Sequence, residues 1–200
     1  MPNASEKPLC PLLAALRQGT AACHRALEAR LPFFDEHFDH RAYQRLLEAY
    51  YGFHAPLEQA LAGHLPALAP QRRAKAPALI NDLQNLGLSA RQIDALPLCQ
   101  ALPRITGDAQ ALGVMYVLEG STLGGQVLKR AMAERLAIGA ANGGAFLDVY
   151  GPETGALWRR FLHFLEHAAV SPAQQEHAVQ AAIDTFASFE RWLDRQGVLL

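Results

Sequence analysis

Apolar residues recur every three or four positions along most of the chain, which is the spacing of one face of an α-helix. The chain is also rich in Ala, Leu, Gln, Glu and Arg, which favour helices, and it shows no sustained alternation of apolar and polar residues. We therefore expect about six helices and no strand. The expected helices cover Leu9–Arg30, Asp39 (as a cap) to Leu65, Pro70–Leu86, Asp108–Leu136, Thr154–Ala169, and Ser171-Pro172 to Arg195.

Proline and glycine residues mark the ends of these stretches. Pro32 and Pro66 follow the first two, and Gly87 follows the third. Residues 89–103 predict a looser connection with room for a short helix, and residues 138–152 predict a glycine-rich loop. No repeat, low-complexity tract or linker divides the chain. We expect one all-α domain over residues 1–200, with its core at about 12–195.

Composition narrows the classes of function. Half of the 200 residues are hydrophobic and 18% are charged, which is typical of a compact globule. The formal net charge of -1 provides no global basic field for nucleic acid. Three scattered cysteines without a CxxC pair indicate neither a thiolate zinc site nor a disulfide framework. The same cysteine pattern predicts a reducing, cytoplasmic location. Met1 to Pro11 lack the long apolar run of a signal peptide, and no apolar run in the chain is long enough to span a membrane.

The first helix carries a histidine with suitable neighbours for a metal ligand. Arg17 lies seven residues before His24, on nearly the same face and about 10 Å away along the axis. Thr20 and Glu28 lie one turn to either side. A haem requires such a set, because its iron binds an imidazole, a carboxylate orients that imidazole, and basic side chains pair with the propionates. The same residues also fit an ordinary surface histidine among solvated charges.

The longest expected helix contains glycines at 120, 124 and 125 within strongly helical flanks. Each interior glycine costs about 1 kcal/mol relative to alanine, so their presence indicates a bend or a close approach to the backbone. Gly120 and Gly124 share a face on which a flat ligand can lie, and Ser121 beside them offers a hydroxyl for water. Close packing of two helices is the alternative interpretation. A phosphate-binding loop is disfavoured, because the G-x-x-x-x-G-K-[ST] motif and its preceding strand are missing.

Together these segments resemble the haem oxygenase family, and its bacterial branch in particular. Residues 16–28, LRQGTAACHRALE, are similar to the family's proximal-helix motif. Residues 120–130, GSTLGGQVLKR, are similar to its glycine-rich distal-helix motif, and this match is the more specific. The two motifs occur in the expected order and separation, and the resemblance covers about residues 12–195.

The resemblance implies an enzyme that binds haem as its substrate and opens it with O2 and electrons to biliverdin, carbon monoxide and Fe2+. By position, His24 corresponds to the iron ligand and Glu28 to its orienting partner, while Gly120 and Gly124 lie over the distal face. Other positions are expected at the propionates or against the haem: Arg17, Arg159, Phe189, and Thr20, Tyr116 and Gly125 on the two motif helices.

One position departs from the family pattern. Many members carry an Asp directly after the first glycine of the distal motif, where it organises water for proton delivery, and this chain has Ser121. The relay is then expected to run through Ser121, Thr122, backbone carbonyls or a residue that the sequence does not identify.

The resemblance also implies partners outside the chain. Electrons must come from an external ferredoxin or flavoprotein reductase, because the chain carries no flavin or iron–sulfur motif. A bacteriophytochrome is one acceptor that could take up the biliverdin.

Parts of the sequence also fit other functions. The sequence His163-Phe-Leu-Glu-His167 fits the H-x-x-E-H pattern of certain zinc peptidases, although a third ligand is expected and few candidates follow it. A haem carrier or sensor that does not degrade haem is the main alternative. A purely structural helical module is disfavoured by the cost of the glycines.

Overall fold

Helices form all of the regular structure in the computed structural model, which describes residues 10–200. Within that range there is no strand, so the all-α prediction is confirmed. Among the described residues, no helix is long and apolar enough to cross a membrane. The α-helices are α1 (Pro11–Arg30), α2 (His40–Leu61), α3 (Ala76–Asn85), α4 (Ala90–Asp94), α5 (Asp108–Leu136), α6 (Thr154–His167) and α7 (Pro172–Arg195). The short 3-10 helices are η1 (Pro32–Phe34), η2 (Pro66–Leu68), η3 (Pro70–Arg73), η4 (Phe146–Asp148) and η5 (Gly151–Glu153).

Three predicted helix ends have the expected chemistry. The Asp39 carboxylate accepts a hydrogen bond from the amide of Ala42 at the start of α2. Ser171 and Gln174 form a capping box at the start of α7, with Pro172 as the first helical residue. Gly87, just beyond α3, adopts a φ of +100°, which glycine accepts at no steric cost.

Other boundaries differ from the sequence prediction. The helix expected over Pro70–Leu86 is divided into η3 and α3, because Pro77 lacks the N–H that would bond to the carbonyl of Arg73. α2 ends at Leu61 rather than Leu65, which adopts the left-handed region with a φ of 49°. Most of the stretch Met1 to Pro11, and Leu9 as the first residue of the expected Leu9–Arg30 helix, belong to residues 1–9, which lie outside the described residues.

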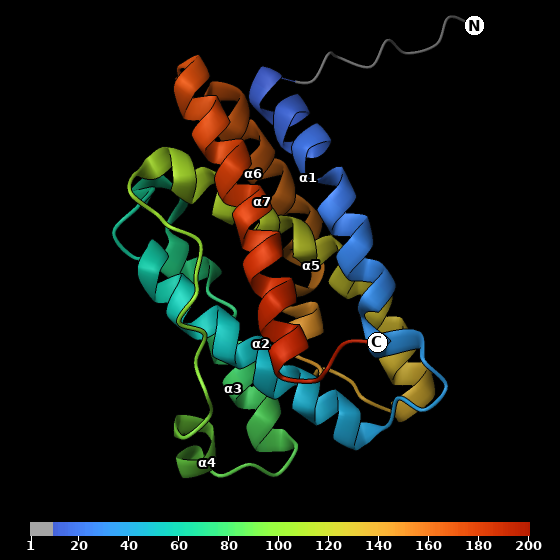
Figure 1. The fold of residues 1–200 in the computed structure, drawn as a ribbon. Coiled ribbons are helices and arrows are strands. Elements are labelled where there is room, and N and C mark those ends of the chain that lie inside the picture. Colours follow the sequence, from blue (N-terminus) through green and yellow to red (C-terminus); the bar gives the residue numbers. More distant parts are fainter. Residues whose placement is uncertain (1–9) are drawn as a thin grey trace, which may run out of the picture.

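The helices are arranged around α5 and α7. α5 packs most extensively on α7, and α7 also packs on α1 and α2, while α6 contacts both α1 and α5. Figure 1 shows α1 and α7 running side by side, with α5 crossing behind them and α2 and α3 below. The chain end returns to α1, where the amide of Leu200 donates to the carbonyl of Arg30 at 2.9 Å.

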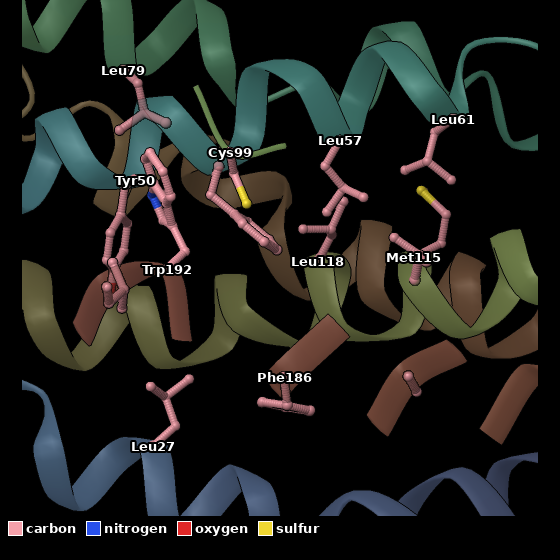
Figure 2. Close-up of a cluster of buried hydrophobic side chains, with 14 of the residues drawn as sticks. Leu27, Tyr50, Leu57, Leu61, Leu79, Cys99, Met115, Leu118, Phe186 and Trp192 are labelled. Atoms are coloured by element: carbon pink, nitrogen blue, oxygen red, sulfur yellow. The ribbon is translucent and has the colours of Figure 1, made fainter. Parts of the chain in front are cut away.

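The buried side chains fill the space between α2, α5 and α7 (Figure 2). Leu57 and Leu61 of α2 lie near Met115 and Leu118 of α5 in this cluster. The indole of Trp192 on α7 is buried as well, and its Nε1 donates to the carbonyl of Ala49 at 2.7 Å. These contacts fix α5 relative to α2 and α7, and α5 carries the predicted glycine-rich motif.

Of the glycines in α5, Gly113 lies closest to the backbone of a neighbouring element, which is α7. A Cβ added there would lie 1.9 Å from the carbonyl oxygen of Ala178 on α7. We predict that Gly113→Ala lowers the free energy of unfolding by about 2–3 kcal/mol, because the two helices must separate. Urea denaturation measures the change. A Gly113→Ala protein as stable as the native one would show that this helix contact is not tight.

Candidate functional site

One cavity of about 530 Å³ lies between α1 and α5, and its volume falls in the range of small-molecule and cofactor sites. α2, α6, α7 and the segment around η4 complete its wall. Much of the lining is aromatic, and the contributing residues are Tyr50, Tyr116, Phe146, Trp158, Phe186 and Phe189. The cavity is therefore suited to a flat, largely apolar ligand.

α1 brings the predicted polar set to this cavity. Arg17, Thr20, His24 and Glu28 all line it, as helical spacing requires. The Nδ1 atom of His24 lies 3.2 Å from Oε2 of Glu28, and the imidazole meets the ring of Phe186 edge-on at 5.7 Å between centroids. Because Glu28 engages Nδ1, the Nε2 atom of His24 is the nitrogen left for a metal.

Thr20 connects this wall to α5. It is buried, and its hydroxyl donates to the carbonyl of Leu16 at 2.7 Å. Burial raises the pKa of Tyr116 on α5, while a hydrogen bond with Thr20 and the positive charge of Arg17 act in the opposite direction. Tyr116 therefore remains a neutral phenol that can donate a hydrogen bond at the cavity wall.

α5 remains one helix through the three glycines of the motif, but these glycines have different surroundings. A Cβ added at Gly124 would meet nothing within 4 Å, and one at Gly120 would meet only Trp158, at 3.8 Å. A Cβ at Gly125 would lie 2.7 Å from the carbonyl oxygen of Leu147. Gly120 and Gly124 thus open the helix backbone to the cavity, whereas Gly125, which also lines it, permits the close packing of η4.

The hydroxyls beside the glycines are directed to the helix backbone. Ser121 donates to the carbonyl of Leu118 at 2.9 Å, and Thr122 donates to the carbonyl of Glu119 at 2.7 Å. In this arrangement the Ser121 oxygen can still accept a hydrogen bond from water or a ligand.

His54 on α2 also lines the cavity, and the sequence interpretation missed it. Its Nδ1 atom lies 3.4 Å from Oε1 of Glu58, one turn later on the same helix. Glu58 in turn accepts hydrogen bonds from the amides of Lys75 (2.7 Å) and Ala76 (3.1 Å), so it caps the start of α3. The i, i+4 spacing of His54 and Glu58 was visible in the sequence, but nothing there placed α2 beside α5.

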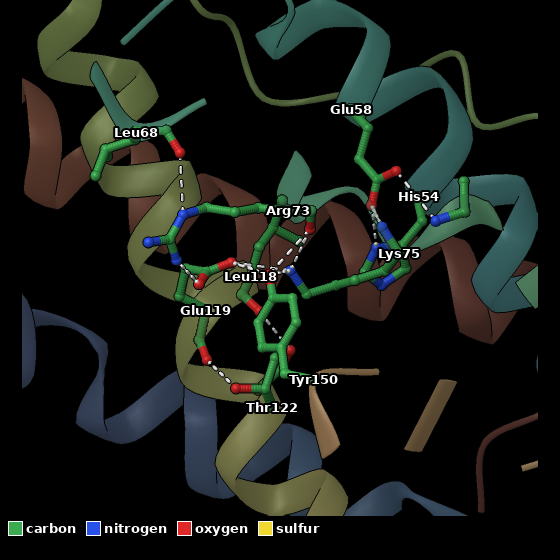
Figure 3. A network of polar contacts seen from close by, with 11 residues as sticks. His54, Glu58, Leu68, Arg73, Lys75, Leu118, Glu119, Thr122 and Tyr150 are labelled. Atoms are coloured by element: carbon green, nitrogen blue, oxygen red, sulfur yellow. Dashed lines mark hydrogen bonds and ion pairs between the residues drawn. The ribbon is translucent and has the colours of Figure 1, made fainter. Parts of the chain in front are cut away.

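A buried ionic cluster joins α5 to the residues around η3 and to Tyr150 (Figure 3). Glu119, only 1% exposed, pairs with the guanidinium of Arg73 and with the Lys75 ammonium at 3.0 Å. Tyr150 donates its hydroxyl to Oε1 of Glu119 at 2.8 Å. Burial raises the pKa of Tyr150, and the negative charge of Glu119 raises it further, so the phenol stays protonated. Lys75 also lines the cavity, so the cluster joins the residue preceding Gly120 to two other segments.

Arg159 is the one predicted site residue that the structure places away from this cavity. It lines a separate shallow hollow on α6 with Ala156, Arg160 and His163. All other predicted residues line the main cavity, including Phe189 on α7. Arg25, which was not among the predicted residues, also lines it and supplies a second guanidinium on α1, eight residues after Arg17.

We predict that Glu119→Ala lowers the free energy of unfolding by about 3–5 kcal/mol, because Arg73 and Lys75 would remain buried without their shared partner. Urea denaturation measures this change and compares it with that of the control Glu28→Ala. Glu28 is a half-exposed partner of His24, so its removal should lower the free energy of unfolding by less than about 1 kcal/mol. Equal losses in the two variants would contradict the structural role given to the cluster.

Glu58 should make stability depend on pH. Burial raises its pKa, but the hydrogen bond and charge of His54 and the amides of Lys75 and Ala76 outweigh burial, so the pKa lies below its ordinary value of 4.5. Its stabilising contribution is therefore complete above that value and is lost as the pH falls through the lowered pKa. We predict that Glu58→Gln is less stable than the native chain at neutral pH and that the difference narrows in acid. A difference that widens in acid would reverse the assigned direction.

Known proteins share both the sequence pattern and the fold. A family model described as heme oxygenase matches residues 10–195. A heme oxygenase of Xanthomonas campestris pv. campestris (strain 8004) is 32% identical over 160 residues, covering 78% of this chain and 92% of that protein.

Solved structures agree in fold at lower identity. The heme oxygenase of Leptospira interrogans superposes with a TM-score of 0.75 at 18% identity, covering 92% of this chain and 98% of that one. The NO- and CO-bound heme oxygenase of Neisseria meningitidis superposes with a TM-score of 0.73 at 23% identity. The match covers 92% of this chain and 91% of that one. Heme oxygenase-1 of Synechocystis sp. PCC6803, crystallised in complex with heme, superposes with a TM-score of 0.72 at 19% identity. This match also covers 92% of this chain and 91% of that one.

Proposed function

The chain belongs to the haem oxygenase family, and we propose that it uses O2 and externally supplied electrons to open haem to biliverdin, carbon monoxide and Fe2+. The family resemblance inferred from the two motifs is thereby confirmed. One observation carries the proposal for this site. His24, paired with Glu28, lines the same cavity from α1 that the open Gly120 and Gly124 line from α5.

The residues of the cavity fit a haem. Its aromatic lining matches a flat apolar ring system, and Gly120 and Gly124 leave room for that ring to approach the α5 backbone. Arg17 and Arg25 would pair with the two propionates, because guanidinium groups bind carboxylates with two parallel hydrogen bonds. Arg159 lies on another surface, so Arg25 replaces it in the proposal.

On the α1 side, His24 would hold the iron through Nε2. Oε2 of Glu28 lies 3.2 Å from Nδ1, where the carboxylate would fix the tautomer and the orientation of the imidazole. When bound, haem supplies the iron that activates O2 and the macrocycle that is opened. A neutral imidazole donates less electron density than a thiolate, the ligand that favours early cleavage of the O–O bond.

On the α5 side, the protein would exclude bulk water and supply protons. Leu123 and Trp158 join Gly120 and Gly124 in the lining. His54 is 4% exposed and borders the cavity, and Glu58 holds its Nδ1 atom. We assign proton delivery to His54, with Ser121 accepting a hydrogen bond from an intervening water, because this chain lacks the Asp found in many relatives.

The proposed reaction requires partners outside the chain. Electrons would come from a ferredoxin or flavoprotein reductase, and a bacteriophytochrome remains a proposed acceptor of biliverdin. No binding of nucleic acid is proposed, and the cytoplasmic location stays a prediction from the sequence. The organisation of residues 1–200 as one domain also stays a prediction from the sequence.

Turnover tests the reaction itself. Purified protein loaded with hemin and given ascorbate or a reductase system should lose its Soret band and gain the absorption of a bilin, and chromatography then identifies the biliverdin isomer. A stable ferrous-oxy complex without bilin would instead favour a haem carrier or sensor.

We predict that His24→Ala weakens or shifts the Soret band of the hemin complex, because the iron loses its axial imidazole. His177→Ala is the matched control, since His177 is an exposed histidine on α7 outside the cavity lining. An unchanged spectrum in His24→Ala would show that another residue binds the iron.

Gly124→Ala should separate ligand binding from stability. An alanine at this helical position meets no neighbour within 4 Å, so the free energy of unfolding should rise by up to about 1 kcal/mol. The same methyl group enters the space proposed for the haem, and we predict that the Kd for hemin increases by roughly tenfold. Fluorescence quenching by hemin and urea denaturation measure the two effects. Unchanged hemin affinity would mean that haem does not lie against Gly124.

A further inference from the structure

The last turn of α6 carries a cluster of metal-ligating side chains outside the cavity. His163, Glu166 and His167 are exposed, and one ligand atom from each can be chosen so that all three lie within 4.8 Å of one another. None of them lines the cavity between α1 and α5. We propose that these three residues form a surface binding site for a divalent transition-metal ion of the zinc class.

The two histidines already lie together. Their ring centroids are 4.2 Å apart, as expected for residues spaced i, i+4 on a helix. Nδ1 of His167 is hydrogen-bonded to the carbonyl of His163 at 2.8 Å, which leaves its Nε2 atom for a metal. This hydrogen bond orients the second imidazole in the manner that backbone carbonyls orient metal-binding histidines.

The third ligand supplies negative charge. Oε2 of Glu166 lies 4.0 Å from Nδ1 of His163. Ligand atoms around a tetrahedral zinc ion lie about 3.4 Å apart, given metal–ligand distances of about 2.0–2.1 Å. The His163 side chain is 73% exposed, so no buried neighbour opposes the small rotation that metal binding requires.

The position on the helix also favours a cation. α6 ends at His167, so the cluster lies in the last turn, where unpaired carbonyls create a partial negative charge. Arg159 and Arg160 oppose this effect from the preceding turn, where they border a shallow hollow together with His163. Their charges are exposed to solvent and screened by salt, whereas the ligands bind the ion directly.

The donor atoms select the class of metal. Two imidazoles and one carboxylate suit Zn2+, Ni2+ or Cu2+, whereas Ca2+ and Mg2+ prefer sites made of oxygen ligands. Three ligands on an exposed surface leave the remaining positions to water. The H-x-x-E-H pattern is therefore interpreted as a metal-binding surface, and no peptidase activity is proposed.

Isothermal titration calorimetry, with ZnCl2 titrated into the protein, tests the site. The native chain should bind one more Zn2+ per chain than the double variant His163→Ala/His167→Ala. Glu166→Gln should keep that ion but with at least tenfold higher Kd, equivalent to about 1.4 kcal/mol. His177→Ala, which removes an exposed histidine from α7, should match the native chain. Circular dichroism confirms that the helices are retained.

Equal zinc stoichiometry and affinity in the native chain and the double variant would overturn the proposal, as would an equal loss in His177→Ala. The titration is repeated in a His24→Ala background, where the extra ion should persist. Zinc binding at His163, Glu166 and His167 does not depend on haem binding. Hemin that fails to bind would contradict the proposed function alone, and the loss of the extra zinc ion would contradict this site alone.

Discussion

The buried carboxylate of Glu119 determines where the α5 wall of the cavity lies. A charge that is 1% exposed is stable only when opposite charges and hydrogen bonds surround it, and Arg73, Lys75 and Tyr150 provide them from two segments outside α5. Glu119 directly precedes Gly120, so this ionic cluster fixes the backbone at the point where the cavity requires it to be bare. The same lysine borders the cavity, and its amide joins Glu58 and thereby His54 to the network. Displacement of α5 would therefore alter both the shape of the cavity and its charged rim.

Glycines on α5 have two separate structural roles. Gly113 and Gly125 are required by close packing, because a Cβ at either position would collide with a carbonyl oxygen of α7 or of η4. Gly120 and Gly124 have space around them and need no such explanation from packing. Their cost in helix stability is offset only if the bare backbone has a use, and contact with a flat ligand provides one. His24 and Glu28 occupy the opposite wall, where helical spacing alone brings them together.

Local features were predictable from the sequence, and features that depend on tertiary packing were not. The cap at Asp39, the Ser171-Pro172 start of α7 and the extent of α5 follow from local sequence patterns. The break at Pro77 was also local, but the apolar periodicity across it predicted one continuous helix. His54, Lys75 and Arg25 were missed because their relation to the cavity depends on where tertiary packing places α2, the start of α3 and α1. Arg159 was assigned by family position, yet the register of α6 directs Trp158 rather than its neighbour to the cavity.

The central claim is that α1 and α5 hold a haem between them, with its iron on His24. Crystals of the hemin-loaded protein, measured at the iron absorption edge, locate that atom directly. The account predicts one strong anomalous peak inside the cavity, within bonding distance of Nε2 of His24 and facing the backbone at Gly120 and Gly124. An iron peak bonded to His54, or located outside the cavity on α6, would contradict it.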